Sequence, residues 1–210
     1  MARFGINPKN TLGVSIPVIR DLAKTQCKNP RRHELALELW KTGIHEARLL
    51  AGFIDDSKKV SEAQMESWAR DFDSWDVCDQ ACSNLFDQTP FAWRKAREWT
   101  KRKEEFVKRA GFVLMACLAV HDKKADDKKF LAFLPIIKRE ARDERNFVRK
   151  AVNWALRQIG KRSKALNAAA VKTASEISRI DSKAARWIAA DALRELESPA
   201  VQKRLLKKRE

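Results

Sequence analysis

The sequence has few residues that break helices and little that would build strands. Its 210 residues include only six glycines and six prolines, and no tyrosine. Alanine, leucine, lysine, arginine and glutamate dominate, and all five are strong helix formers. No sustained alternation of Val, Ile or Thr with polar residues occurs, which argues against β-strands. We therefore predict an all-α protein.

Breakers such as Asn29-Pro30, Thr89-Pro90 and Ser198-Pro199 divide the chain into helical segments. The predicted helices cover residues 15–27, 31–41, 44–55, 61–70, 74–86, 90–100, 103–120, 128–141, 144–160, 163–178, 181–196 and 198–208.

Cysteine and histidine are too sparse for a metal site or a histidine-centred catalyst. Cys78 and Cys82 share a helix face, but no second close pair or nearby histidine completes a tetrahedral zinc site. We interpret the four cysteines as small apolar core residues in a reducing compartment. The three histidines are isolated, and His45 is interpreted as a surface or capping residue. We expect no metal and no other cofactor.

Motifs that hold nucleotides or activate a serine are also missing: GxGxxG, a Walker-type Gly-Lys-Ser/Thr loop and GxSxG. The longest uncharged run, residues 110–120, is too short to span a bilayer and is typical of a buried helix. Nothing at the N-terminus resembles a signal peptide. We expect a cytoplasmic protein without membrane contact. Any catalysis must rest on carboxylate, aromatic and arginine groups.

The charge is strongly unbalanced, with 44 Lys and Arg against 28 Asp and Glu, a net charge of +16. Such an excess favours a polyanionic partner, most simply nucleic acid. The alternative is a basic protein whose charge serves only solubility. Seven tryptophans and a hydrophobic share of 44% indicate a folded chain rather than a disordered basic tail.

Internal similarity relates the helices to one another. "FVKRAGFVLMACLA" (residues 106–119) aligns with "FVRKAVNWALRQIG" (residues 147–160), an offset of 41 residues, with fainter echoes at 45–55 and 182–193. Helical units that repeat near this period are typical of an α-solenoid of HEAT or armadillo type, which we favour over an irregular bundle. We predict one repeat domain over residues 1–210, with a basic concave face.

The stretch "DSWDVCD" (residues 73–79) places three carboxylates around one tryptophan. We interpret Asp73 as an N-cap and Asp76 as a first-turn residue that suits the helix dipole. Asp79 lies one turn after Trp75, about 40° around the helix, so the two side chains are neighbours. Either Asp79 pairs with a cation while Trp75 packs, or the two form part of a functional site.

Two further side chains are unusual in their helices. Trp154 lies roughly 130° from the centre of its helix's apolar stripe, beside basic residues, so it either packs against a neighbouring helix or offers a stacking surface. Arg109 is followed by eleven uncharged residues. Its guanidinium needs an anion, either a carboxylate such as Asp79 or a phosphate.

The segments "SWDVCD" (74–79), "FVKRAGFVL" (106–114) and "FVRKAVNWALRQIGK" (147–161) occur in an order that resembles the AlkD-like DNA alkylation repair family. The resemblance implies a HEAT-like solenoid that holds double-stranded DNA in a basic groove. It also implies a metal-independent glycosylase that removes N3- or N7-alkylated purines without flipping the base. We expect such a protein to be a monomer that associates with the nucleoid when bound to DNA.

By the family pattern, Asp79 is the catalytic carboxylate, Trp75 and Trp154 are the two cleft tryptophans, and Arg109 is the cleft arginine. Cationic residues elsewhere would contact the phosphate backbone: Arg20, Lys108, Arg149, Lys150, Arg157, Lys183 and Arg186. Two alternatives stay open. One is a non-catalytic HEAT module that binds damaged, branched or bent DNA, and the other is a protein-interaction solenoid.

Overall fold

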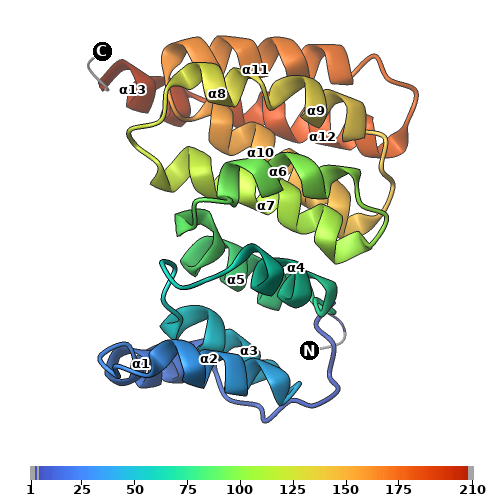
Figure 1. The fold of residues 1–210 in the computed structure, drawn as a ribbon. Helices are drawn as coiled ribbons and strands as arrows, with labels where there is room; N and C mark the ends of the chain where they lie inside the picture. Colours follow the sequence, from blue (N-terminus) through green and yellow to red (C-terminus); the bar gives the residue numbers. More distant parts are fainter. Residues whose placement is uncertain (1–2, 4, 208–210) are drawn as a thin grey trace. The chain divides into compact units, whose positions relative to one another are not determined.

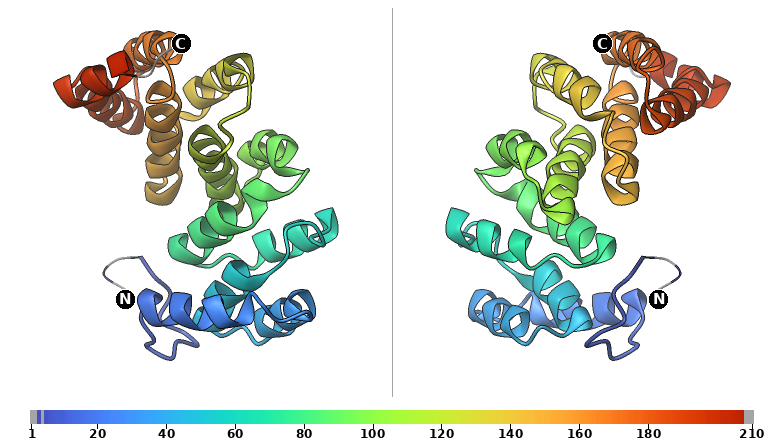
Figure 2. Two further views of the ribbon diagram at one scale, coloured as in Figure 1. Left: turned by 90° about the vertical axis from the view of Figure 1, so that its left-hand side faces the viewer. Right: turned by 90° about the vertical axis from the view of Figure 1, so that its right-hand side faces the viewer.

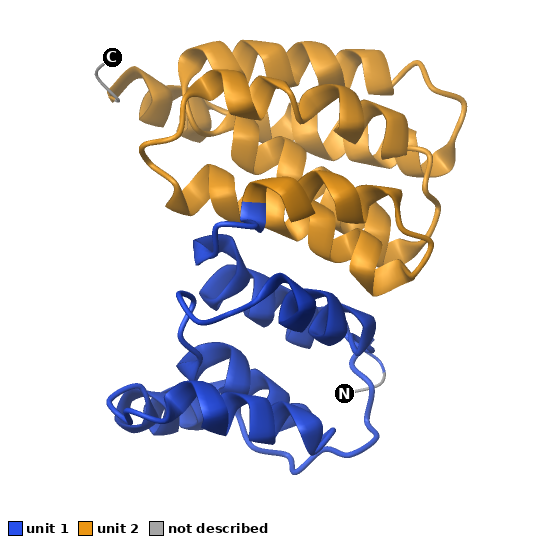
Figure 3. Ribbon diagram, viewed as in Figure 1, with its two compact units in different colours: residues 1–92 blue, residues 93–210 orange. Residues whose placement is uncertain are grey.

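The computed structural model describes residue 3 and residues 5–207. Within these residues the chain is helical and contains no β-strand (Figure 1), which confirms the all-α prediction. Clustering of contacts divides the chain into two compact units, residues 1–92 and 93–210 (Figure 3). Each unit is described by itself. The single domain expected from the sequence stays a prediction.

Unit 1 contains five α-helices in its described residues and a short 3-10 turn at Phe86–Gln88. The helices are α1 (Ile16–Gln26), α2 (Arg32–Lys41), α3 (His45–Ile54), α4 (Glu62–Arg70) and α5 (Trp75–Asn84). Helix α3 packs against α1, α2 and α5. The indoles of Trp40 and Trp68 stack with ring centroids 3.9 Å apart, which fixes α2 against α4.

Unit 2 begins at the second residue of α6 (Ala92–Glu98) and includes a 3-10 turn at Trp99–Lys101. Its further helices are α7 (Glu105–His121), α8 (Asp127–Leu131), α9 (Leu134–Glu140), α10 (Asn146–Gly160), α11 (Lys164–Ile177), α12 (Lys183–Leu196) and α13 (Pro199–Lys207). Helices α7, α10 and α12 form one layer, and α6, α8, α9 and α11 form the other (Figures 1 and 2).

Local chemistry explains where many of these helices begin and end. The hydroxyls of Ser61, Ser163 and Ser182 each accept a hydrogen bond from the backbone N–H three residues later, at 3.1–3.2 Å. Pro135 lies in the first turn of α9. Because proline lacks an N–H and clashes with the preceding turn, the helix predicted over residues 128–141 is divided into α8 and α9.

The repeat in the sequence appears as recurring contacts in unit 2. Phe106 and Phe147, the equivalent first residues of the aligned segments, lie 5.4 Å apart between ring centroids on α7 and α10. Hydrogen bonds between side chains or carbonyls 38 positions apart link successive repeats, as from Arg109 to Phe147 and from Asn153 to Asp191. Equivalent positions of neighbouring repeats therefore meet, as a stacked helical repeat requires.

The cysteines agree with the sequence interpretation except at one position. Cys78, Cys82 and Cys117 form no disulfide and are buried among apolar residues. Cys27 is exposed, so its assignment to the core is wrong. It follows the last residue of α1, where the apolar face of the helix has already ended, and its thiol donates to the carbonyl of Phe53 at 3.5 Å.

Candidate functional site

Trp75 and Asp79 lie one turn apart on α5, and both side chains are partly exposed. Ser74 is extended (φ −148°, ψ 152°), so the helix begins at Trp75 itself. Val77, Cys78, Ala81 and Cys82 anchor the buried side of α5. The i, i+4 spacing then brings the indole and the carboxylate together at the margin of that buried face. The structure thus confirms the predicted helical placement of this pair.

A buried histidine and aspartate hold α5 in place. His45 Nε2, at the start of α3, lies 2.8 Å from Asp76 Oδ2. Its hydrogen bond with Asp76 raises the pKa of His45, although burial acts in the opposite direction. The interpretation of His45 as a surface residue is wrong because it is only 5% exposed. Asp76 does lie in the first turn, as expected, but it is buried against this partner.

Asp73 does not cap α5, so the N-cap interpretation is also wrong. Ser74 occupies the N-cap position, and its hydroxyl donates to Asp73 Oδ1 at 3.3 Å. Asp73 Oδ2 instead accepts a hydrogen bond from Asn7 Nδ2 at 2.7 Å. Asp73 therefore fastens the N-terminal segment to the start of α5 and is separate from the Trp75–Asp79 pair.

Arg20 lies beside α5 in unit 1. Its Nη2 donates to Gln80 Oε1 at 2.9 Å, and its guanidinium lies over the ring of Phe53, 4.5 Å from the centroid. The side chain is exposed on α1. Since Gln80 directly follows Asp79, the structure places a predicted DNA-binding cation next to the helix that carries the predicted catalytic carboxylate.

Arg109 connects two helices of unit 2. It is only 6% exposed, and its Nη1 donates to the carbonyl of Phe147 at 2.6 Å. Phe147 lies in the first turn of α10, the helix that carries Trp154. A charge-assisted hydrogen bond of this length fixes α10 against α7. A backbone carbonyl thus accepts one hydrogen bond from the guanidinium, and the anion expected for Arg109 stays a prediction.

Trp154 is partly exposed on α10, between the buried residues Asn153 and Ala155. Asn153 donates to Asp191 Oδ2 on α12 at 2.6 Å, which sets the rotation of α10 in the layer. The buried stripe of α10 contains Val148, Val152 and Ile159. Trp154 lies off that stripe and is neither fully packed nor fully exposed.

Four of the six predicted DNA-binding cations of unit 2 fall into two groups. Lys108 is bound to Glu140 Oε2 at 2.6 Å and to Asp143 Oδ2 at 2.8 Å, with its side chain only 12% exposed. Arg157 pairs with Glu195 and lies 3.6 Å from Asp191. Such neutralised cations are less suited to phosphate contact. By contrast, Lys150 and Lys183 are exposed and have no ion-pair partner among the described residues.

The layer formed by α7, α10 and α12 also contains an exposed aromatic residue that the sequence analysis did not predict. Trp187 on α12 is 38% exposed, and the guanidinium of Arg149 lies 5.2 Å from its ring centroid. Arg186, the next residue back, is exposed and pairs with Asp181 at 3.0 Å. The segment around Trp187 was one of the faint repeat echoes, so its match to the Trp154 helix was the available signal.

The described residues contain no cluster of three or more His, Cys, Asp or Glu side chains able to hold a metal ion. No helix within the described part of the chain is both long and apolar enough to cross a membrane. The predicted site residues are divided between the two units, with Trp75 and Asp79 in unit 1 and Arg109 and Trp154 in unit 2.

Comparison with known proteins identifies the family. The profile of the DNA alkylation repair enzyme family matches residues 1–196. The chain belongs to this family. No curated protein matches this chain. A solved structure matches with a TM-score of 0.74 and 22% identity, covering 93% of this chain and 87% of the other.

That structure was described as "a new family of proteins related to the HEAT-like repeat DNA glycosylases with affinity for branched DNA structures". At this level of identity the likeness establishes the fold. This member of the DNA alkylation repair family is therefore an all-α protein of HEAT-like repeat fold, as the sequence predicted.

Proposed function

We propose that this protein is a DNA glycosylase that removes N3- or N7-alkylated purines from duplex DNA without flipping the base and without a metal. Membership of the DNA alkylation repair enzyme family supports a role in repair. The observation that carries the proposal is the Trp75–Asp79 pair, one turn apart at the partly exposed margin of α5 and braced by His45 and Asp76.

The chemistry needs no histidine or metal because an N3- or N7-alkylated purine is already cationic. When the bond between C1′ and the base nitrogen breaks, its electron pair neutralises the departing purine and positive charge develops on the deoxyribose. A carboxylate at Asp79 and the aromatic face of Trp75 would stabilise that charge. Water then attacks C1′ and gives up one proton to the solvent, and Asp79 would orient this water.

In unit 2, Trp154 and Arg109 would contact the sugar-phosphate region near the lesion, with Arg109 also fixing the helix that carries Trp154. Phosphates elsewhere would be bound by cations that are exposed or partly exposed. We assign this role to Arg20, Arg149, Lys150, Lys183 and Arg186. Lys108 and Arg157 are left out of this set because partly buried carboxylates neutralise them, whereas the Arg186–Asp181 pair is exposed to solvent.

Release of 7-methylguanine or 3-methyladenine from methylated duplex DNA, in the presence of a chelator, tests the proposal. Asp79→Asn should lower the rate by roughly two to three powers of ten, the usual effect of removing one electrostatic stabiliser. DNA affinity should stay similar or rise, since a negative charge near phosphates is removed.

Asp73→Asn is the matched control because it makes the same charge change on the same segment, away from the Trp75–Asp79 pair. Its release rate should equal that of the wild type. Release no faster than spontaneous depurination in the wild type would reject the glycosylase.

A second function, binding of branched, damaged or bent DNA without excision, is favoured by the description of the similar solved structure. Under this alternative Trp154 is a stacking surface. Trp154→Ala would then weaken DNA binding by about 1–3 kcal/mol, the usual value of a stacked base. A preference for branched over linear duplex, with no base release, would select it over the glycosylase.

A further inference from the structure

A basic pocket lies in unit 2, where α7 and α10 end. Its volume is about 230 Å³, and Ala119 and Val120 at the end of α7 form the apolar part of its lining. The amide of Gln158 also lines it. Four cations complete the lining, and none of the described residues adds a carboxylate to it: Lys123, Lys161, Arg162 and Arg204. These cations come from separate segments, namely the loop after α7, the end of α10 and α13.

Two of these four cations are bound to carbonyls and carboxylates, some of them at helix ends. Helix C-termini carry partial negative charge on their last carbonyls. Arg162 donates to the carbonyls of Ala119 and Ala125, at 3.3 Å and 2.7 Å, and its Nε binds Asp127 at 3.2 Å. Lys161 binds Glu195 at 2.6 Å. The contacts of Arg162 and Lys161 therefore stabilise the packing of unit 2.

Such contacts do not explain why Lys123 and Arg204 lie at the pocket. Both are exposed, and neither has a carboxylate partner among the described residues. Arg204 makes one hydrogen bond, to the carbonyl of Lys161 at 3.0 Å, which fixes its guanidinium at the pocket without neutralising it. A guanidinium has five donors in a planar fork, suited to the oxygens of a phosphate. The pocket thus retains a positive charge that no described carboxylate balances.

We propose that this pocket binds a phosphate group, held by Lys123 and Arg204 with Gln158 as a neutral donor. Gln158 lies one turn after Trp154 on α10, so the pocket continues the helix face that carries Trp154. The phosphate is therefore a backbone phosphodiester of bound DNA, or a free phosphate monoester of the same chemistry. The assignment to DNA rests on the proposed function, whereas phosphate binding itself does not.

The test is a titration of the full chain with inorganic phosphate, followed by the amide NMR signals of residues 158–162 at constant ionic strength. Saturable shifts that chloride does not produce are expected, and Lys123→Gln/Arg204→Gln should abolish them. Lys123→Gln alone should weaken them, and this exposed side chain has no partner whose loss would unfold the protein.

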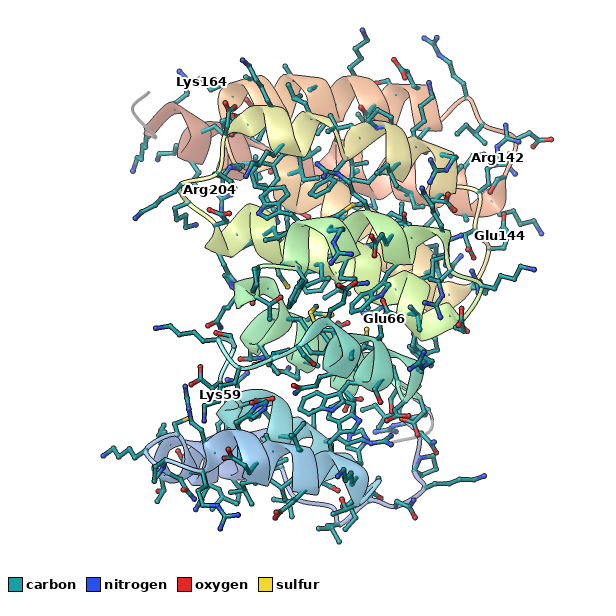
Figure 4. All side chains as sticks on the ribbon, viewed as in Figure 1. Lys59, Glu66, Arg142, Glu144, Lys164 and Arg204 are labelled. Carbon is teal, nitrogen blue, oxygen red and sulfur yellow. The ribbon has the colours of Figure 1, made fainter. Side chains whose placement is uncertain are left out.

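The matched control removes two cations elsewhere in the unit, Arg142→Gln/Lys172→Gln. Figure 4 shows Arg142 and Arg204 at opposite edges of unit 2. Arg142 and Lys172 are exposed without ion-pair partners in the described chain. This variant should bind phosphate as the wild type does.

The salt dependence of DNA binding distinguishes a DNA backbone phosphate from a free phosphate in the pocket. If the pocket holds a DNA phosphate, the double pocket variant lowers the slope of log K against log salt by about 0.9, the value of one phosphate contact. An unchanged slope with saturable phosphate shifts assigns the pocket to a free phosphate. If phosphate produces no saturable shifts and the slope of DNA binding does not change, the proposal is refuted. Base release by the wild type is measured separately, so failure of the glycosylase would leave the phosphate result standing.

Discussion

His45 Nε2 and Asp76 Oδ2 lie 2.8 Å apart across the contact between α3 and α5, with side-chain exposures of 5% and 12%. This pair joins the start of α3 to the first turn of the helix that carries Trp75 and Asp79. The hydrogen bond to Asp76 is the main reason that the pKa of His45 is raised, and the nearby carboxylates of Glu46 and Asp73 act in the same direction.

The raised pKa of His45 makes the stability of the protein depend on pH. Because the folded-state pKa lies above the unfolded value of about 6.5, the stabilisation is complete below that pH. It is lost as the pH rises through the raised pKa. Urea unfolding of the wild type should therefore show a falling midpoint from mildly acidic to mildly alkaline pH. His45→Gln should flatten this part of the profile, and an identical profile in both proteins would refute the role of the pair.

Lys108 is expected to act in folding rather than in DNA binding. Lys108→Gln would leave the partly buried Glu140 and Asp143 without their ammonium partner, at a cost of about 1–3 kcal/mol in the free energy of unfolding. The slope of DNA binding against salt should stay unchanged. Lys150→Gln, which changes an exposed lysine on α10, should instead lower that slope by about 0.9 without a loss of stability.

Asp143, which pairs with Lys108, also makes the stability of the protein depend on pH in the acidic range. Burial raises the pKa of Asp143, but hydrogen bonds from Arg145 and Lys108 outweigh this effect and hold it far below its usual value. A lowered pKa gives stability that is present above about pH 3.8 and is lost as the pH falls through the folded-state value. Asp143→Asn should therefore remove part of the acid dependence seen in unfolding of the wild type. A steeper or unchanged acid limb would contradict this assignment.

Arg109 combines a structural and a proposed functional role, and two substitutions separate them. Arg109→Met leaves the carbonyl of Phe147 without this donor, which should cost about 1–3 kcal/mol of stability. Arg109→Lys retains a cation near that carbonyl and should recover part of the loss. If the guanidinium also contacts DNA, base release stays low in Arg109→Lys despite the recovered stability. Full release by this variant would limit Arg109 to fixing α10.

The sequence predicted what depends on local spacing. Helix positions follow from the order of helix formers and breakers, and the i, i+4 relation of Trp75 and Asp79 follows from the helix alone. The repeat offset between residues 106 and 147 likewise anticipated the contact of Phe106 with Phe147. These features need no knowledge of which helices pack together.

Pairings between distant residues were not predictable in this way. His45 and Asp76 are 31 positions apart, and the residues around either one do not indicate the other as its partner. The same holds for Lys108, whose carboxylate partners lie on α9 and in the loop before α10. A basic residue in a sequence is equally compatible with a phosphate contact and a buried ion pair. Only the packing of helices decides between the two roles.

Two helical glycines provide a matched test of that packing. A Cβ on Gly111 of α7 would lie 2.8 Å from the backbone nitrogen of Thr100 and 3.1 Å from the carbonyl carbon of Trp99, neither of which can move aside easily. Alanine normally stabilises a helix by about 1 kcal/mol relative to glycine. At Gly111 the clash should reverse this sign, with a net loss of about 1–3 kcal/mol in the free energy of unfolding.

Gly52 of α3 is the control, because a Cβ there would meet Ala81 at 3.5 Å, an ordinary contact distance. Gly52→Ala should therefore be neutral or stabilising. Urea unfolding of both variants measures the difference directly. Equal effects of the two substitutions would mean that α7 does not pack against the turn at Trp99–Lys101 as closely as the structure places it.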